Sequence, residues 1–342
     1  MTPSVQVTYH PNAACQRVRK KLLGDAKVEP RKLVEQRLPY GQLSRDLPIR
    51  PLSLGGCSEV TLLRHRPGLG DMVSLMGAID RFKEQHPGVA ITLLGEHPIL
   101  SIAENHPSID RVISDKGELN LKSQFVDLSN PGPCAVLEGY FRSPEPANRS
   151  LLFAAALGLQ KTNTPQVFIT EEEREWARQW FAERGLEKPV GVVYQTASRI
   201  KNFLNLPELF TRVQWDFDAY LIEHEEVGAA EPTTQGLTIR EQAALIGESK
   251  AVISPDTGWL HVAGSLGIPL IGLFGSYPAQ QTMSIYQVPT LPVVGYCPLG
   301  QQPCRGRIPC SIEEGFEHPP CLSQTVGEVF PQIKSFLNRY AA

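Results

Sequence analysis

The hydrophobic pattern of the chain changes at about residue 60. From there on, short apolar runs that are typical of buried strands alternate with stretches in which apolar residues recur at helical spacing. Strands that alternate with helices in this way pair in parallel, and the helices cover both faces of the sheet. The pattern therefore predicts an α/β protein with doubly wound parallel sheets. Strands are expected at 60–64, 89–94, 111–113, 125–129, 190–194, 217–222, 251–254 and 270–275.

The expected helices are marked by residues that favour helix ends. Thr170 and Glu173 have the spacing of a capping box, and Gly185 ends the helical stretch that follows them. Thr238 is expected to cap a later helix. Other helices are predicted at 72–86, 97–105, 147–159 and 326–342.

The chain is predicted to fold into two domains, because a new first strand follows the segment 186–189, which has the composition of a hinge. Residues 1–59 lack the strand-and-helix rhythm, apart from an alternating apolar piece at 5–9, and are interpreted as an N-terminal extension. The predicted parts are the extension, a first Rossmann-like domain at 60–188, a second at 189–325 and a C-terminal helix at 326–342.

The stretch 251–278 is predicted to run strand, loop, helix and strand. Asp256 or Thr257 can cap the helix, whose first free amides attract anions. Gly258 lets a ligand approach the backbone closely, and His261 lies one turn further along the same face. A phosphate group would fit this place, although a plain β-α-β crossover with a capped helix has the same pattern.

A second candidate site follows the strand at 60–64. Gly68 and Gly70 are expected to form a tight loop whose amides face a ligand at the strand end, where open α/β sheets bind their ligands. Asp71 stands where this loop becomes a helix. It is either a helix cap or a functional carboxylate.

Composition and charge narrow the function classes. The 342 residues are 42% hydrophobic with a net charge of -3, which is ordinary for a globular protein and argues against a protein that mainly coats nucleic acid. No apolar run reaches the roughly 18 residues of a membrane helix, and a cytoplasmic location is expected. Residues 10–50 carry a local charge of +6 that could meet an anionic acceptor, a membrane surface or a partner subunit, or form a solvated arm.

Four of the seven cysteines fall in one segment rich in proline and glycine. They are Cys297, Cys304, Cys310 and Cys321. In a reducing compartment such a cluster is either a metal site or a set of small buried side chains, and the spacing lacks the CxxC pattern of a zinc knuckle. Structural zinc or iron is one of the two interpretations.

Two stretches together resemble glycosyltransferase family nine, the bacterial heptosyltransferase family. They are LLRHRPGLGDMVSLMGAIDRFKEQHPG and SPDTGWLHVAGSLGIPLIGLFGSYP, with a G-x-G-D pattern in the first and a D-T-G-x-x-H-x-A pattern in the second. The resemblance extends over about residues 60–290. It implies a GT-B architecture, in which two Rossmann-like domains face each other across a cleft.

The resemblance also implies roles for individual residues. Asp71 would be the general base on the acceptor side, and Lys201 would neutralise the diphosphate of the donor. The donor-side contacts that it implies are Thr196 and the loop at Asp256, Thr257, Gly258 and His261 for the phosphates, Glu223 for the ribose and Leu237 for the adenine. The chain departs from the family at Ala197, which follows Thr196 where a second hydroxyl is common, and in its 59-residue extension.

The chemistry of inverting sugar transfer agrees with these roles, because it needs one base for the acceptor proton and positive charge for the departing diphosphate. No DxD-type carboxylate pair stands at a strand end, so metal-independent chemistry is expected. The predicted function is transfer of a heptose or related sugar from an ADP-sugar to a cell-surface glycan or protein acceptor. The alternatives are a transferase or epimerase that uses a UDP-sugar, and a non-catalytic protein that binds nucleotide-sugars.

Overall fold

The computed structural model forms two compact units, residues 1–168 and residues 169–342. Each unit has its own parallel sheet, so the predicted α/β class with doubly wound sheets is confirmed. No helix in the described part of the chain is long and apolar enough to cross a membrane. The structure describes residues 5–8, 28–31, 56, 58–64, 68–95, 98–113, 124–127, 149–194, 201–222, 232–297 and 319–340.

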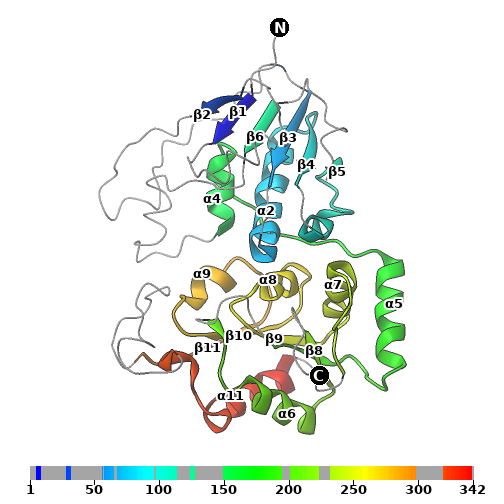
Figure 1. Ribbon diagram of the computed structural model, residues 1–342, viewed down its shortest axis with the longest axis vertical. Helices are drawn as coiled ribbons and strands as arrows, with labels where there is room; N and C mark the ends of the chain where they lie inside the picture. Colours follow the sequence, from blue (N-terminus) through cyan, green and yellow to red (C-terminus); the bar gives the residue numbers. More distant parts are fainter. Residues whose placement is uncertain are drawn as a thin grey trace. The chain divides into compact units, whose positions relative to one another are not determined.

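The first unit is built on a four-stranded parallel sheet with the order β5-β4-β3-β6 (Figure 1). Its strands are β3 (Glu59–Leu63), β4 (Ala90–Leu94), β5 (Arg111–Ile113) and β6 (Gln124–Asp127). The side chains of β3 and β4 are almost all buried, as expected for parallel strands that are covered on both faces. Because β3 pairs with both β4 and β6, the strand order reverses beside β3.

Two helices of the first unit pack closely on each other. They are α2 (Leu69–Gln85) and α4 (Arg149–Ala156), and they are joined by a buried hydrogen bond that the Ser150 hydroxyl donates to the carbonyl oxygen of Ser74 at 2.6 Å. Gly77 allows another close approach, since a Cβ atom there would lie 2.2 Å from the carbonyl oxygen of Asn163.

Two expectations for the first unit are changed by the structure. The helix predicted at 97–105 is the 3₁₀-helix η1 (Pro98–Ala103). It lies close to Asn105, whose φ of 63° cannot continue a right-handed helix. The alternating piece at 5–9 forms strand β1 (Val5–Thr8), which pairs in parallel with β2 (Val28–Arg31) and contacts β6.

The second unit holds a five-stranded parallel sheet with the order β11-β10-β9-β7-β8 (Figure 1). Every residue of β7, β8, β9 and β10 is buried, which explains the continuous apolar runs in the sequence. The strands are β7 (Val190–Val193), β8 (Ala219–Ile222), β9 (Ala251–Pro255), β10 (Leu270–Phe274) and β11 (Thr290–Val294).

Helices cover both faces of this sheet. Figure 1 shows α7 (Ile239–Gly247), α8 (Gly258–Ser265) and α9 (Ala279–Met283) on one side, and α6 (Leu206–Asp216) and α11 (Val326–Tyr340) on the other. The apolar faces of α6 and α11 share one hydrophobic core with β7, β8, β9 and β10. The expected capping box at Thr238 is present before α7.

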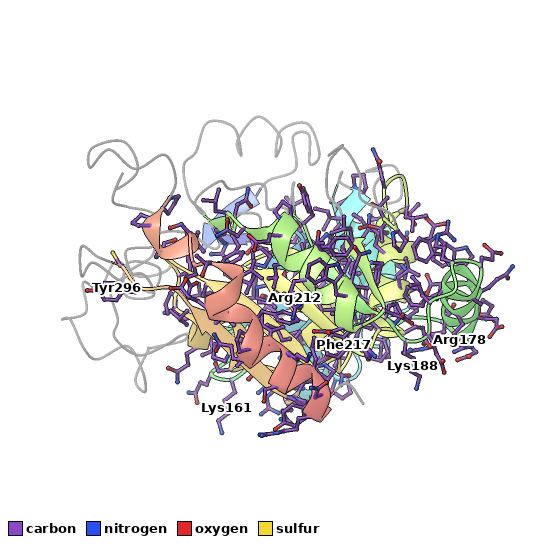
Figure 2. All side chains as sticks on the ribbon, turned by 90° about the horizontal axis from the view of Figure 1, so that it is seen from below. Lys161, Arg178, Lys188, Arg212, Phe217 and Tyr296 are labelled. Atoms are coloured by element: carbon purple, nitrogen blue, oxygen red, sulfur yellow. The ribbon has the colours of Figure 1, made fainter. Side chains whose placement is uncertain are left out.

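The C-terminal helix is an integral part of the second unit. Figure 2 shows α11 and α6 side by side, with Arg212 on the surface near their contact. The guanidinium carbon of Arg212 lies 4.9 Å from the centre of the Phe330 ring, and Lys334 Nζ lies 2.9 Å from Asp216 Oδ2. Core packing and surface pairs together hold α11 against α6.

Helix α5 (Glu171–Ala182) belongs to the second unit, whereas the sequence interpretation placed it in the first domain. Its capping box between Thr170 and Glu173 is present as predicted. Glu173 also accepts a 2.7 Å hydrogen bond from Arg240 Nε on α7, and Arg174 lies 2.8 Å from Glu248. The compact units therefore divide between residues 168 and 169, before α5, and not at the hinge-like segment 186–189.

Candidate functional site

The second sheet has its topological switch point between β7 and β9. The chain continues from β7 to β8 on one side and from β9 to β10 and β11 on the other, so the connections leave in opposite directions. Open α/β sheets bind ligands outside the carboxyl ends of the strands at such a point. Lys201 follows β7 and Asp256 follows β9, which places both predicted residues at this end of the sheet.

Lys201 and Asp256 contact each other directly. Lys201 Nζ lies 2.7 Å from Asp256 Oδ2 and 4.3 Å from the centre of the Tyr277 ring. The other carboxylate oxygen of Asp256 accepts a long hydrogen bond of 3.5 Å from the Thr282 hydroxyl. The carboxylate and the aromatic face hold an ammonium group in place at the strand end, where it can meet an anion.

Helix α8 begins beside this ion pair. Its N-cap residue is Thr257, which is one of the two predicted caps. Within the described residues, however, the Thr257 side chain makes no capping hydrogen bond. Thr257 Oγ1 lies instead 2.9 Å from the hydroxyl of Ser254, and Asp256 is paired with Lys201. The amides of the first turn, from Gly258 onward, are therefore not capped by the side chain of either residue.

His261 lies one turn into α8 and contacts a residue that the sequence interpretation did not single out. Its Nδ1 atom is 2.8 Å from the hydroxyl of Tyr286, which follows α9 and is only 5% exposed. Burial raises the pKa of the Tyr286 phenol, so this hydroxyl stays protonated. The Nδ1 atom of His261 therefore has a hydrogen-bond partner within the protein.

The first sheet has its switch point between β3 and β6, and Asp71 follows β3. Helix α2 begins at Leu69 with Gly68 as its N-cap residue, so Gly70 and Asp71 are the second and third helical residues. The expectation that Gly70 belongs to a loop is therefore wrong. Asp71 is not the N-cap residue either, because the helix has already begun two residues earlier.

Asp71 is held by two arginines that the sequence interpretation did not single out. Arg149 Nε lies 2.9 Å from Oδ1, and the Nη2 atoms of Arg149 and Arg64 donate to Oδ2 at 3.2 Å and 3.5 Å. Both guanidinium groups also lie over the Phe153 ring, at 5.2 Å for Arg64 and 5.9 Å for Arg149. The carboxylate thus stands between a buried cation and a partly exposed one.

The exposed fractions show how this cluster meets solvent. The side chain of Arg64 is 2% exposed, while those of Arg149 and Asp71 are 28% and 33% exposed. Arg149 is the first residue of α4, where a cation is unfavourable because the helix dipole is positive at its N-terminus. Asp71 compensates this charge, and its carboxylate stays accessible to solvent.

Several predicted site residues lie outside the described part of the chain, so their roles stay predictions. They are Thr196, Glu223, Cys304 and Cys310. Leu237 is described and half-buried just before α7, and its carbonyl oxygen accepts a 3.0 Å hydrogen bond from the side chain of Gln242. This contact orders the segment, while adenine binding by Leu237 stays a prediction.

The two described cysteines of the predicted metal site come together. Cys297 and Cys321 are buried in one small cluster with Leu322. Glycines let the backbone pack tightly there, since a Cβ atom at Gly295 would lie 1.8 Å from the carbonyl oxygen of Cys321 and one at Gly275 would lie 2.8 Å from its sulfur. Two buried cysteines at one place fit a thiolate metal site. The described residues alone contain no group of three metal ligands.

Each unit is a doubly wound, Rossmann-like fold, and the known structures that share the fold of the chain are glycosyltransferases. A glycosyltransferase family 9 structure from Veillonella parvula matches with a TM-score of 0.64 at 15% identity, over 82% of this chain and 98% of the other. Escherichia coli ADP-heptose LPS heptosyltransferase II matches with a TM-score of 0.61 at 15% identity, over 83% and 100%. The iron-containing dodecameric glycosyltransferase TibC from enterotoxigenic E. coli matches with a TM-score of 0.58 at 12% identity, over 86% and 78%.

A family model described as glycosyltransferase family 9 (heptosyltransferase) matches residues 234–308. This range contains the segment from Asp256 to His261. No curated protein matches the chain by sequence. The family match lies within the second unit, and the solved structures share the fold of the chain.

Proposed function

We propose that the protein transfers a heptose or a related sugar from an ADP-sugar to a cell-surface glycan or protein acceptor, with inversion at the anomeric carbon. Lys201 neutralises the diphosphate of the donor, and Asp71 accepts the proton of the acceptor hydroxyl. Neither step uses a metal ion. Each role is supported by contacts within the unit that carries the residue.

The observation that carries this proposal is the meeting of Lys201 and Asp256 at the switch point of the second sheet. This pair places a cation beside the first turn of α8, where backbone amides also favour negative charge. A diphosphate carries the complementary charge. Its binding would draw the ammonium group from one carboxylate toward several phosphate oxygens.

The choice of ADP-heptose as the donor rests on the structural relatives. One is described as an ADP-heptose LPS heptosyltransferase, and TibC is described in complex with ADP-D-beta-D-heptose, with a TM-score of 0.58. Both are distant in sequence and share the fold with this chain. They favour an ADP-sugar over a UDP-sugar as the donor to be tested first.

The proposed reaction is balanced by residues of the chain. The acceptor hydroxyl oxygen forms a bond to the anomeric carbon of the donor while its proton passes to the Asp71 carboxylate. The bond from the anomeric carbon to the diphosphate oxygen breaks, and the electron pair leaves with the diphosphate. The positive charge of Lys201 stabilises the negative charge that develops on this leaving group.

The environment of Asp71 supports its proposed role. A structural ion pair needs one partner, whereas Asp71 has a guanidinium group on each side and still exposes a third of its surface. The arginines leave lone pairs on both carboxylate oxygens, because each oxygen can accept more than one hydrogen bond. An acceptor hydroxyl can therefore reach a base that is already oriented.

A structural metal ion and the site of action complete the proposal. We assign Cys297, Cys304, Cys310 and Cys321 to one zinc or iron ion that fastens the segment after β11, with no part in the chemistry. We also place the protein in the cytoplasm. The basic segment 10–50 would meet an anionic acceptor or the inner membrane face there.

Calorimetric titration of the protein with ADP, UDP and GDP tests the donor assignment. ADP should bind more tightly than UDP or GDP, and an ADP-heptose donor should then support sugar transfer to an extract of cell-surface glycans. If UDP binds more tightly than ADP, the donor is a UDP-sugar and not an ADP-sugar. Binding of none of the three nucleotides would contradict the proposed transfer reaction.

A further inference from the structure

Tyr286 and His261 form a pair in which a buried phenol faces one nitrogen of a partly exposed imidazole. The Tyr286 hydroxyl lies 2.8 Å from Nδ1 of His261, and the two rings meet edge to face with their centres 5.9 Å apart. Tyr286 comes from the segment between α9 and β11, and His261 comes from α8. The contact therefore links the donor-side helix to a different part of the second unit.

Gly264 makes this contact possible. It lies one turn after His261 on α8, and a Cβ atom there would stand 2.5 Å from the Cγ atom of the Tyr286 ring. Any larger side chain would push the ring away from the helix. The backbone amide of Tyr286 also donates to the carbonyl oxygen of Met283 at 3.1 Å, which ties the tyrosine to the end of α9. The position of the phenol is thus set from two sides.

The direction of the hydrogen bond follows from counting donors and acceptors. A phenol has one proton to donate, and within the described residues His261 Nδ1 is the hydrogen-bond partner that the structure shows for the Tyr286 hydroxyl. If Nδ1 carried a proton and donated it, the buried O–H of Tyr286 would lack an acceptor, which is costly. If the phenol donates to Nδ1, this cost disappears. The raised pKa of the buried phenol also keeps its proton in place.

We infer that Tyr286 is a positioning residue that holds His261 in the tautomer with its proton on Nε2, so that an uncharged His261 donates a hydrogen bond to a phosphate oxygen of the nucleotide-sugar. This inference rests on the proposed function, which places the donor phosphates at the start of α8. The hydrogen bond at one imidazole nitrogen decides which proton the other nitrogen carries. Tyr286 acts through His261 and does not itself touch the donor.

This arrangement gives the two groups at the phosphate different tasks. Lys201 supplies positive charge, whereas His261 supplies one directed donor whose orientation is set before the ligand binds. A preoriented donor loses less side-chain entropy on binding than a free one. Removal of the Tyr286 hydroxyl should therefore weaken nucleotide binding even though the His261 imidazole is still present.

The first experiment measures the tautomer without any ligand. Nitrogen-15 correlation spectra of the imidazole groups distinguish a protonated from an unprotonated ring nitrogen, and a His261→Gln variant assigns the signal among the eight histidines. In the wild type, His261 should be protonated on Nε2 alone. In Tyr286→Phe, the Nδ1-protonated and the Nε2-protonated tautomers of His261 should both be populated. Protonation on Nδ1 in the wild type would overturn the inference.

The second experiment measures ADP affinity by calorimetry for Tyr286→Phe, His261→Ala and Tyr220→Phe. Tyr286→Phe should weaken ADP binding by about threefold to tenfold, the range for one neutral hydrogen bond. Tyr220→Phe is the matched control, because Tyr220 is also buried in the same unit and loses one hydrogen bond of 2.9 Å, to Ser249, away from α8. Its ADP affinity should stay at the wild-type value.

The outcomes separate this inference from the proposed function. If His261→Ala weakens ADP binding and Tyr286→Phe behaves like Tyr220→Phe, the positioning role of Tyr286 is wrong and the donor site stands. If ADP binding is unchanged in His261→Ala as well, the placement of the phosphates at α8 is wrong. Melting curves of all variants show whether a loss of affinity comes from loss of folding.

Discussion

The two switch points of the molecule carry opposite charge patterns. In the first unit a carboxylate, Asp71, stands between two arginines, whereas in the second unit a cation, Lys201, is held by a carboxylate and an aromatic ring. The sheet topology places each of them in the same way, after a strand that borders the reversal of strand order. Equivalent positions in two similar folds thus carry side chains of opposite charge.

Under the proposed function, the difference lies in the group that each site must receive. A base needs an oriented carboxylate that keeps free lone pairs, and a diphosphate site needs positive charge that can be redirected to a ligand. A bidentate guanidinium contact orients a carboxylate well, while an ammonium group on a flexible stem can change partners. Substitutions at the two sites test this contrast.

The largest effect is expected for Asp71→Asn. Turnover should fall by about 10²- to 10⁴-fold, because an amide cannot accept the acceptor proton. The fold should survive, since the asparagine oxygen still accepts hydrogen bonds from the arginines. Sugar transfer and melting temperature are the measurements. The control is Asp110→Asn, which removes another ion-paired carboxylate of the first unit, next to Lys83. If Asp71→Asn keeps nearly full activity, Asp71 is not the general base.

The next effect is expected for Lys201→Ala, which should weaken ADP binding by about 1.5 to 3 kcal/mol, the range for a hydrogen bond with a charged group. Calorimetric titration measures this change. Lys250→Ala is the matched control, because Lys250 also lies near an aromatic ring, 5.7 Å from the centre of Phe217, in the same unit. Equal affinities of the wild type and Lys201→Ala would exclude the lysine from the nucleotide site.

A smaller effect is expected for Arg149→Ala. Turnover should fall by about tenfold with little change in nucleotide affinity, because the variant loses an oriented, charge-assisted contact to Asp71. Arg149→Lys should restore only part of the activity, since a lysine cannot make the two-pronged contact. The control is Arg81→Ala, which breaks the exposed pair with Glu84 at 2.7 Å. In the Asp71→Asn background, Arg149→Ala should have no further effect on turnover.

The smallest effect on turnover is expected from metal chelation. Because the proposed chemistry uses protein groups alone, brief treatment with EDTA should leave sugar transfer unchanged. Elemental analysis of untagged protein should nevertheless find close to one zinc or iron ion per chain, bound by the cysteine segment. A stable, fully metal-free protein would contradict the structural metal, and loss of turnover in EDTA without unfolding would contradict the metal-independent mechanism.

Local sequence signals predicted the elements that local physics controls. The capping boxes at Thr170 and Thr238 are present as expected, because the residues that form them lie within one helical turn. The strands of the two large sheets were predicted from apolar runs that reflect burial on two faces, with the exception of β11, whose side chains are mostly exposed or half-buried. The 3₁₀-helix at Pro98–Ala103 was predicted as an ordinary helix, since a short apolar stretch has no signal that separates the two.

The alternation of strands and helices follows from the local pattern of the sequence, as does the placement of Asp71, Lys201 and Asp256 after strand ends. Their partners follow from the tertiary packing, because contacts between distant parts of the chain depend on how the elements pack. Arg149 reaches Asp71 across 78 positions, and α5 joins the second unit through charges on α7 that no local pattern displays. Tyr286 likewise meets His261 because the segment after α9 packs back onto α8 at a glycine.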